Sequence, residues 1–372
     1  MLRILSSLLT ALLLLTSCAD TASDAPQQGS ILLTVGTRRA VTMRTALVSS
    51  DNLQHVRYVQ LYAFEGTTDD ATCVMSYNLG WTQPTGTTAQ QTFQLPTSAL
   101  HLDGTTPYTF LCVGLDNLPS EAQSEGAATA YQLPQAIGLG SRLGTAAAHL
   151  ASGLGAQDMA RAELFAGTTV QVLKGGEKNL VSVDLYRRVA GVQVYVDDIP
   201  EGVTEVRLVL YRTQHSSVPL VKQTDDADGT FRDYATDSLL DSQTLLSLPV
   251  TSKTTAESEV EIADGGAPLV KQQGAIVGGA YVLPVEAPTA GATLRLQLYK
   301  GTALYQTYRV TIKETDGTHT ALYPLRANCF YSLGQLRRDE NDPMSLGEAS
   351  PDITLEVEPN FEKDHDYEVM SL

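Results

Sequence analysis

Residues 56–64 read Val56-Arg57-Tyr58-Val59-Gln60-Leu61-Tyr62-Ala63-Phe64, and their side chains alternate with a period of two. This period is typical of a β-strand with one face in a core. Residues 108–114 read YTFLCVG and are nearly all apolar, as expected for a strand that is covered on both faces. The two stretches together predict an all-β protein.

Similar short runs recur along most of the chain, between turn clusters at residues 197–202, 225–229 and 315–317. Further strands are predicted at residues 30–35, 180–185, 189–196, 204–211, 280–285, 292–299, 305–312 and 329–333. Helical patterns are scarce, and residues 141–163 are predicted to form a loop with short helical pieces. The number and spacing of the strands favour two antiparallel β-sandwiches. Because strand-like runs flank Arg187-Arg188-Val189, we expect a domain boundary there and a stiff joint.

The composition excludes several classes of protein. The 372 residues carry 25 Lys and Arg against 42 Asp and Glu, a net charge of −17. This argues against a nucleic-acid-binding protein, because phosphate recognition needs a basic face. A hydrophobic fraction of 43% argues against general disorder. The sequence holds no nucleophile elbow, zinc-protease motif or P-loop, and its six histidines are scattered. We therefore expect no enzyme, no catalytic residue, no metal site and no cofactor.

The first residues have the pattern of an export signal. Arg3 precedes an apolar stretch at residues 4–15 that is short for a membrane span. Leu15-Thr16-Ser17-Cys18 resembles a bacterial lipobox, which implies removal of residues 1–17 and acylation of Cys18, with palmitate among the acyl chains. Residues 18–29 are polar and predict a tether. The alternative is an ordinary secretory signal with an incidental cysteine.

Three further cysteines, Cys73, Cys112 and Cys329, match no zinc or disulfide spacing. The last two lie in apolar runs, so buried free thiols are favoured, and a disulfide between Cys73 and Cys112 is the alternative. Trp81, near Pro84, is either a core residue or a surface aromatic that stacks on a glycan.

Several segments together resemble a known family. The lipobox is followed by a first strand that ends in Thr37-Arg38-Arg39-Ala40. The other segments that carry the resemblance are residues 56–64, Glu163-Leu164-Phe165-Ala166-Gly167, residues 185–194 (LYRRVAGVQV) and Ala327-Asn328-Cys329-Phe330-Tyr331-Ser332-Leu333. In order and spacing they resemble the Bacteroidales fimbrial subunits, the fimbrillin superfamily of type V pili. Each segment alone is weak evidence for the family, but together the segments cover nearly the whole mature chain.

The resemblance implies two tandem transthyretin-like β-sandwiches, at residues 30–186 and 187–372, on a lipoprotein of the cell outer membrane. In polymerising members an arginine-specific protease cuts after the first strand, and a strand of a neighbouring subunit fills the vacated groove. Here the cut is expected after Arg39 or Arg38, with Arg44 a weaker candidate. Ile31, Leu33 and Val35 would be the plugging side chains. The alternative is that both arginines only solvate a turn.

The C-terminal residues 352–358 (DITLEVE) also alternate, with Ile353, Leu355 and Val357 as their apolar members. They are either a donor strand or the last strand of the second sandwich, and residues 366–372 are a second extended candidate. An acidic stretch at residues 362–366 would keep such a tail soluble.

The family resemblance predicts a structural subunit of a surface-exposed fimbrium that contributes to adhesion. Its partners would be other fimbrial subunits by strand addition, the outer membrane through the lipid on Cys18, and a host or bacterial surface receptor. No nucleic acid is expected. Alternatives are a membrane-retained anchor of the same superfamily and a surface glycan-binding lipoprotein that uses Trp81. A secreted hydrolase is a third reading, for which the sequence offers no nucleophile or metal set.

Overall fold

Strands dominate the protein. The computed structural model describes residues 29–38, 56–82, 88–116, 131–132, 137–150, 156–210, 215–221, 241–252, 256–260, 269–285, 294–314, 325–336, 341–347 and 352–358. The helical pieces within these residues are short: η2 (Leu143–Thr145), α2 (Ala156–Met159) and η3 (Val250–Ser252). The all-β prediction is confirmed, and so are the short helical pieces expected near residues 141–163.

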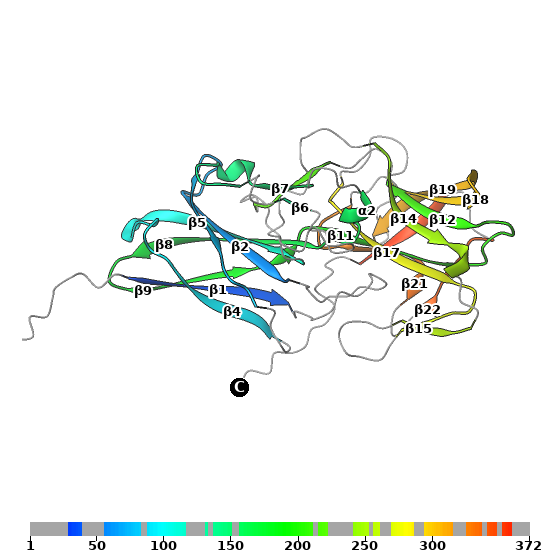
Figure 1. The fold of residues 1–372 in the computed structure, drawn as a ribbon, viewed down its shortest axis with the longest axis horizontal. Helices are drawn as coiled ribbons and strands as arrows, with labels where there is room; N and C mark the ends of the chain where they lie inside the picture. The colour runs from blue at the N-terminus through cyan, green and yellow to red at the C-terminus, as the bar shows by residue number, and fades with distance from the viewer. Residues whose placement is uncertain are drawn as a thin grey trace, which may run out of the picture.

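The N-terminal half is a sandwich of two sheets (Figure 1). Its strands are β1 (Ser30–Arg38), β2 (Tyr58–Glu65), β3 (Thr72–Asn78), β4 (Thr88–Leu95), β5 (Asp103–Leu115), β8 (Leu164–Lys174), β9 (Lys178–Asp184) and β10 (Tyr186–Arg187). One sheet has the order β4-β1-β9 and the other the order β10-β8-β5-β2-β3. The space between them holds one apolar core.

Strand β5 is covered on both faces, as its apolar sequence predicts. Phe110 and Cys112 point into the core of the sandwich, whereas Leu111 and Val113 belong to a second apolar cluster on the opposite face of the sheet. That second cluster continues into the C-terminal half of the molecule. The two halves therefore share apolar packing. At β5, both faces of the larger N-terminal sheet are covered.

The C-terminal half is built on one nine-stranded sheet, with the path β14-β12-β18-β19-β24-β20-β11-β17 and β23 beside β11. These strands are β11 (Ala190–Asp197), β12 (Glu205–Leu210), β14 (Gln243–Pro249), β17 (Ile276–Val282), β18 (Leu294–Lys300), β19 (Ala303–Glu314), β20 (Phe330–Leu333), β23 (Met344–Ser345) and β24 (Asp352–Glu358). The sheet curls, since its two end strands meet. A Cβ on Gly278 of β17 would lie 2.5 Å from Cδ2 of Leu248 in β14.

Short strands complete the fold and join its halves. They are β6 (Tyr131–Gln132), β7 (Ala147–Leu150), β13 (Ser217–Pro219), β15 (Ser258–Val260), β16 (Leu269–Lys271), β21 (Gln335–Leu336) and β22 (Asn341–Asp342). Strand β13 pairs with β7, so a segment that follows the nine-stranded sheet's first strands returns to the N-terminal half. The backbone N–H of Tyr281 in β17 also donates to the carbonyl of Ala160, at 2.9 Å.

The sheets are mainly antiparallel, but they contain parallel pairs that the sequence did not predict. Strand β1 runs parallel to β9, β11 runs parallel to β20 and β23, and β19 runs parallel to β24. In each pair the partners lie far apart in the sequence, so no hairpin fixes their direction. Short-range turn signals cannot reveal such pairs.

The turn predicted at residues 197–202 is present between β11 and β12. Asp198 has a φ of 42° and Gly202 a φ of 79°, both in the left-handed region that such turns use. The turns predicted at residues 225–229 and 315–317 lie outside the described residues.

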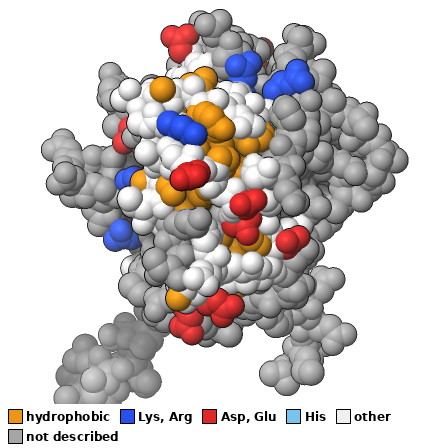
Figure 2. Space-filling view, turned by 90° about the vertical axis from the view of Figure 1, so that its right-hand side faces the viewer, with side chains coloured by type: hydrophobic (Ala, Val, Ile, Leu, Met, Phe, Trp, Pro, Cys, Tyr) orange, Lys and Arg blue, Asp and Glu red, His pale blue; other side chains and the backbone are white. Residues whose placement is uncertain are grey.

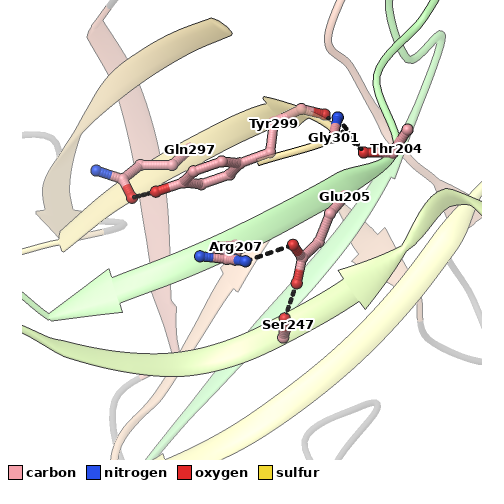
Figure 3. A network of polar contacts seen from close by, with 7 residues as sticks. All are labelled: Thr204, Glu205, Arg207, Ser247, Gln297, Tyr299 and Gly301. Atoms are coloured by element: carbon pink, nitrogen blue, oxygen red, sulfur yellow. Dashed lines mark hydrogen bonds and ion pairs between the residues drawn. The ribbon is translucent and has the colours of Figure 1, made fainter. Parts of the chain in front are cut away.

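Polar side chains also tie neighbouring strands together on the outer face of the nine-stranded sheet (Figure 3). Arg207 of β12 binds Glu205 with 2.6 Å between Nη2 and Oε2, and its guanidinium lies 4.2 Å from the ring centroid of Tyr299 in β18. Ser247 of β14 donates to the same glutamate. The contacts hold three strands in register on a face that water reaches.

Candidate strand-exchange site

Strand β1 is the central strand of its sheet (Figure 1). Eight register pairs join it to β4 in the antiparallel direction, from Ile31 opposite Leu95 to Arg38 opposite Thr88. Seven more join it to β9 in the parallel direction. We call this position between β4 and β9 the β1 slot. The edges of β4 and β9 that face the slot both depend on β1 for pairing, because a strand inside a sheet satisfies the polar backbone groups on both of its sides.

The three predicted plugging residues occupy the inner face of β1. Ile31, Leu33 and Val35 are each 0% exposed and lie in the core between the two sheets. Full burial of one such side chain is worth about 1.5–3 kcal/mol. The triplet therefore fills the core and holds β1 in the slot, as the alternation in the sequence predicts.

The outer face of β1 is uncharged at Ser30, Leu32, Thr34 and Gly36. Thr34 meets Thr92 of β4, with 3.0 Å between their hydroxyl oxygens. Leu32 lies at the register position of Leu180 in β9, whose side chain is 65% exposed. Gly36 leaves room for Asp184, since an added Cβ would lie 2.6 Å from Oδ1 of that residue. The outer face of β1 thus carries no charge between Ser30 and Gly36, and the carboxylate of Asp184 lies close to its end.

Asn179 holds the beginning of β1 in place, and sequence reasoning missed it. Its Oδ1 accepts from the N–H of Lys174 at 2.8 Å, and its Nδ2 donates to the carbonyls of Lys174 at 2.9 Å and of Ser30 at 3.4 Å. The N–H of Ser30 donates to the carbonyl of Glu177 at 3.2 Å. In the sequence, the glycine pair Gly175-Gly176 shortly before Asn179 is the signal that could have indicated this turn.

The basic pair Arg38-Arg39 spans the end of β1 and the edge of the described residues. Arg38 is the last residue of β1 and stands at the register position of Thr88. Arg39, Arg44 and the lipidation candidate Cys18 lie outside the described residues. The cleavage and lipidation sites therefore stay predictions.

Residues 352–358 form β24, which is an inner strand of the nine-stranded sheet. Strand β24 runs parallel to β19 and antiparallel to β20. The register sets Ile353 opposite Val310, Leu355 opposite Ile312 and Val357 opposite Glu314. In this structure the segment is therefore a strand of the chain's own C-terminal half, which is one of the two predicted roles. The donor role stays a prediction. Residues 359–372 lie outside the described residues.

Trp81 is a core residue, which removes the basis for a stacking surface. The side chain is 7% exposed, Nε1 donates to the carbonyl of Val56 at 3.1 Å, and the ring lies 6.2 Å from that of Phe93. An indole needs a partner for its N–H when it is buried, and here the chain supplies one before β2. The neighbouring proline and glycine in the sequence gave no sign of this.

Cys73 and Cys112 are free thiols, and the disulfide alternative is wrong. Cys112 lies in the core of the sandwich, whereas Cys73 belongs to the cluster on the other face of the same sheet. Burial raises the pKa of both thiols. Since the thiolate is the reactive form, neither cysteine is prepared for redox chemistry. Cys329 is half-buried.

A buried ion pair at the junction of the halves is a second feature that sequence reasoning missed. Nη2 of Arg187 lies 2.7 Å from Oε1 of Glu163, and both side chains are almost fully buried. The guanidinium lies 5.5 Å from the ring centroid of Phe165 in β8 and 6.0 Å from that of Tyr281 in β17. Next to it, Nη2 of Arg188 donates to the carbonyl of Pro219 at 2.9 Å. The two arginines thus connect elements of both halves.

Among the residues that the structure describes, no group of three His, Cys, Asp or Glu side chains could hold a metal ion. No helix in the described ranges is long and apolar enough to cross a membrane.

The end of the C-terminal half presents a mixed surface. Hydrophobic side chains gather there among acidic and basic ones (Figure 2). At the start of β19, Leu304 and Tyr305 are about half exposed, and Nζ of Lys300 lies 3.9 Å from the ring centroid of Tyr305. Leu304 and Tyr305 are thus two exposed apolar side chains beside the β18–β19 turn.

Comparison with known proteins gives matches among solved structures alone. No family model matches the chain, and no curated protein does. The chain is similar to a fimbrial assembly protein from Parabacteroides distasonis, at 13% identity over 84% of this chain and 93% of that one, with a TM-score of 0.39. Fimbrial proteins of the Bacteroidales are thus among its structural neighbours.

Two further structures match in a similar way. The tip fimbrial protein Mfa3 from Porphyromonas gingivalis, truncated at its C-terminus, matches at 11% identity over 82% of this chain and 93% of that one, with a TM-score of 0.34. A protein named as an adhesin from Bacteroides ovatus matches at 11% identity over 85% and 91%, with a TM-score of 0.43. These values describe a distant likeness in fold.

Proposed function

We propose that the chain is a structural subunit of a cell-surface fimbrium that assembles by strand exchange and contributes to adhesion. The observation that carries the proposal is the position of β1, which is a first strand held between β4 and β9, ends at Arg38 and is followed at once by Arg39. A cut after these arginines would separate the strand from the rest of the chain without breaking another described element.

Loss of β1 would expose two ladders and one apolar cleft. The inner edges of β4 and β9 would lose their register partners, and the space of Ile31, Leu33 and Val35 would open to water. Unpaired backbone N–H and C=O groups and an apolar cleft both favour the addition of an extended strand. The incoming strand must carry apolar side chains at alternate positions.

Strand β24 has the same apolar triplet in its sequence as β1. Both have isoleucine, leucine and valine at alternate positions in the same order, at residues 31–35 and 353–357. A β24 segment from a second copy would therefore return the same three side chains to the β1 slot without a change in volume. In that register Asp352 would take the place of Ser30 beside Lys178, and Glu358 that of Gly36 beside Asp184.

The test is arginine-specific proteolysis of the folded full-length protein. We expect one early cut, a new N-terminus at Ala40 or Arg39, a folded core and higher-order species on size-exclusion chromatography. The double variant Arg38→Gln/Arg39→Gln is the control and should stay uncut and monomeric. A β1 that resists the protease while other sites are cut, or a cut chain that stays monomeric, would contradict the proposal.

A membrane-retained anchor is the second candidate, and the contacts of Asn179 with the start of β1 favour it, since they stabilise β1 in its slot. The anchor would keep the lipid on Cys18 and its β1 strand. Intact mass and N-terminal sequencing of protein from the native cell envelope separate the two: a start near Ala40 supports the polymerising subunit, and a lipidated start at Cys18 supports the anchor. A glycan-binding lipoprotein loses its main argument because Trp81 is buried.

A further inference from the structure

Strand β9 depends on β1 for its place in a sheet. Among the described residues its ladder runs along β1 alone, with seven parallel register pairs. Directly after β9, the backbone N–H of Leu185 donates to the carbonyl of Gly36 in β1, at 2.9 Å. A weaker β1 therefore acts on β9 directly, because a strand without a ladder partner leaves its backbone groups unpaired and opens more easily.

The chain continues from β9 to the junction of the two halves without a flexible break. Residues 185–189 connect β9 to β11 and contain neither glycine nor proline. Leu185 is buried in the core of the N-terminal sandwich, whereas Val189 is buried in the second apolar cluster, which continues into the C-terminal half. Five residues thus separate the ladder of β1 from a strand in the middle of the nine-stranded sheet.

Few backbone contacts hold this connecting segment at the junction. Strand β10 joins β8 by two register pairs, at Tyr186 and Arg187. The N–H of Arg188 donates to the carbonyl of Leu164 at 2.7 Å. The side chain of Arg187 adds the buried pair with Glu163. Such a pair is favourable only in good geometry, because burial removes both charges from water. A displacement of the segment would therefore weaken the junction.

The other neighbour of β1 leads into a well-paired strand. Strand β4 continues through residues 96–102 into β5, which pairs with β2 on one side and with β8 on the other. These pairings do not involve β1, so β5 keeps both partners when β1 changes. Strand β9 is therefore the more direct route from the β1 slot to the junction.

We propose that the strand in the β1 slot sets how firmly the two halves of the molecule are joined, through β9 and the segment that follows it. A strand that fits keeps Leu185 and the pair of Arg187 and Glu163 in place, and an empty slot loosens them. The inference rests on the proposed function, since strand exchange is what would empty and refill the slot. A subunit would then be stiff when its slot is filled and pliant when it is empty. Coupling of this kind is reciprocal, so a weaker junction must also loosen β1.

The experiment is hydrogen–deuterium exchange of the uncut full-length chain, measured by mass spectrometry. Leu33→Ala weakens β1 in its slot, and Met75→Ala is the matched control, because it removes a buried side chain of β3 from the same core. We expect the N–H groups of Leu185, Arg188 and Tyr281 to exchange roughly tenfold faster or more in Leu33→Ala than in the wild type. In Met75→Ala the increase should stay below about threefold.

Both variants are compared with the wild type at the same interval below their own melting temperatures, so that a general loss of stability does not contribute. If Leu33→Ala does not fold, Leu33→Val takes its place, with a smaller increase expected at the same N–H groups.

The reciprocal measurement starts from the junction. Glu163→Gln removes the charge that pairs with Arg187, and it should speed the exchange of the N–H groups of residues 31–37 by roughly fivefold. Arg142→Met is the control, since it removes an exposed ion pair with Asp70 in the same half and should leave these N–H groups unchanged.

Equal increases at the junction in Leu33→Ala and Met75→Ala would overturn the inference, and so would unchanged exchange of β1 in Glu163→Gln. Neither measurement needs cleavage after β1 or assembly of subunits. A chain that fails the proteolysis test can therefore still show the coupling, and the two failures are distinguishable.

Discussion

Strands β1 and β24 share an apolar triplet in their sequences and differ at the positions between its members. Each has an Ile-x-Leu-x-Val sequence, and each lies between one parallel and one antiparallel neighbour. On the outer face β1 has Ser30, Leu32, Thr34 and Gly36, whereas the corresponding positions of β24 hold Asp352, Thr354, Glu356 and Glu358. The comparison teaches that the two strands match in the volume of their apolar triplets and differ in the charge of the residues between them.

The largest expected effect on stability is at the junction of the two halves, each of which contains one of these strands. Arg187→Met removes the guanidinium that pairs with the buried carboxylate of Glu163. We expect a loss of about 3–5 kcal/mol in the free energy of unfolding, because breaking one side of a buried ion pair leaves a buried charge. Urea unfolding followed by circular dichroism measures it. The double variant Arg187→Met/Glu163→Gln should recover part of the loss, and an unchanged stability of Arg187→Met would contradict the role of the pair.

The next change tests the apolar triplet that β1 and β24 share in sequence. Leu33→Ala removes a fully buried side chain from the core of the sandwich and should cost about 2–5 kcal/mol. Leu355→Ala makes the matching change in β24, and a similar cost is expected if the triplet does the same work there. Leu32→Ala, on the outer face of β1, is the control and should change stability by about 0.5 kcal/mol or less. Chemical denaturation of the three variants would show whether Leu33 and Leu355 contribute equally; equal costs for Leu32→Ala and Leu33→Ala would refute the assignment of the faces of β1.

A smaller change gives β1 the glutamate that β24 has at the corresponding position of the sequence, Glu358. Gly36→Glu places a side chain where a Cβ would lie 2.6 Å from Oδ1 of Asp184, and it adds a like charge. We expect a loss of about 1–3 kcal/mol from crowding, as in overpacked sites. Thermal melting of Gly36→Glu, with Thr34→Glu as the matched control on the same face, measures the effect. The pair Gly36→Glu/Asp184→Asn should be more stable than Gly36→Glu alone, and no recovery would mean that the aspartate does not guard this position.

The smallest effect concerns the response of the N-terminal half to acid. The hydroxyl of Thr106, at 2.6 Å, and the backbone N–H groups of Thr106 and Thr105 all donate to Asp103, and they hold its pKa below the ordinary range. A lowered pKa in the folded state stabilises the protein above the unfolded pKa, and this contribution is lost as the pH falls toward the folded value. Asp103→Asn should reduce the loss of stability below about pH 4. Melting temperatures at pH 2–6 check this, and identical pH profiles would contradict it. The carboxylate is exposed, so the difference will be small.

The sequence predicts most of the longer strands, because a strand with one face in a core needs a period of two. The runs at residues 56–64, 108–114 and 189–196 correspond to β2, β5 and β11. Strand β4 was missed, since its residues 88–95 (TAQQTFQL) are mostly polar and alternate weakly. Strand β7 was missed because it is short and depends on partners on both sides, β6 and β13, for its pairing.

The candidate site was predictable in its side chains but not in its surroundings. The alternation at Ile31, Leu33 and Val35 predicts one buried face. The place of β1 between β4 and β9 depends on pairings with residues about 60 and 150 positions away, which a local pattern does not contain. The same reason explains why Asn179 and Glu163 were missed, since their partners come from other segments.

The double ladder of β1 has a mechanical consequence. A force directed along the axis of an edge strand that peels away breaks its hydrogen bonds one after another. A force along a strand with seven register pairs on one side and eight on the other shears both rows together, so many bonds must yield at once. A segment that occupies this position would therefore resist tension well beyond what its equilibrium affinity suggests, and it would yield more readily to peeling from one end.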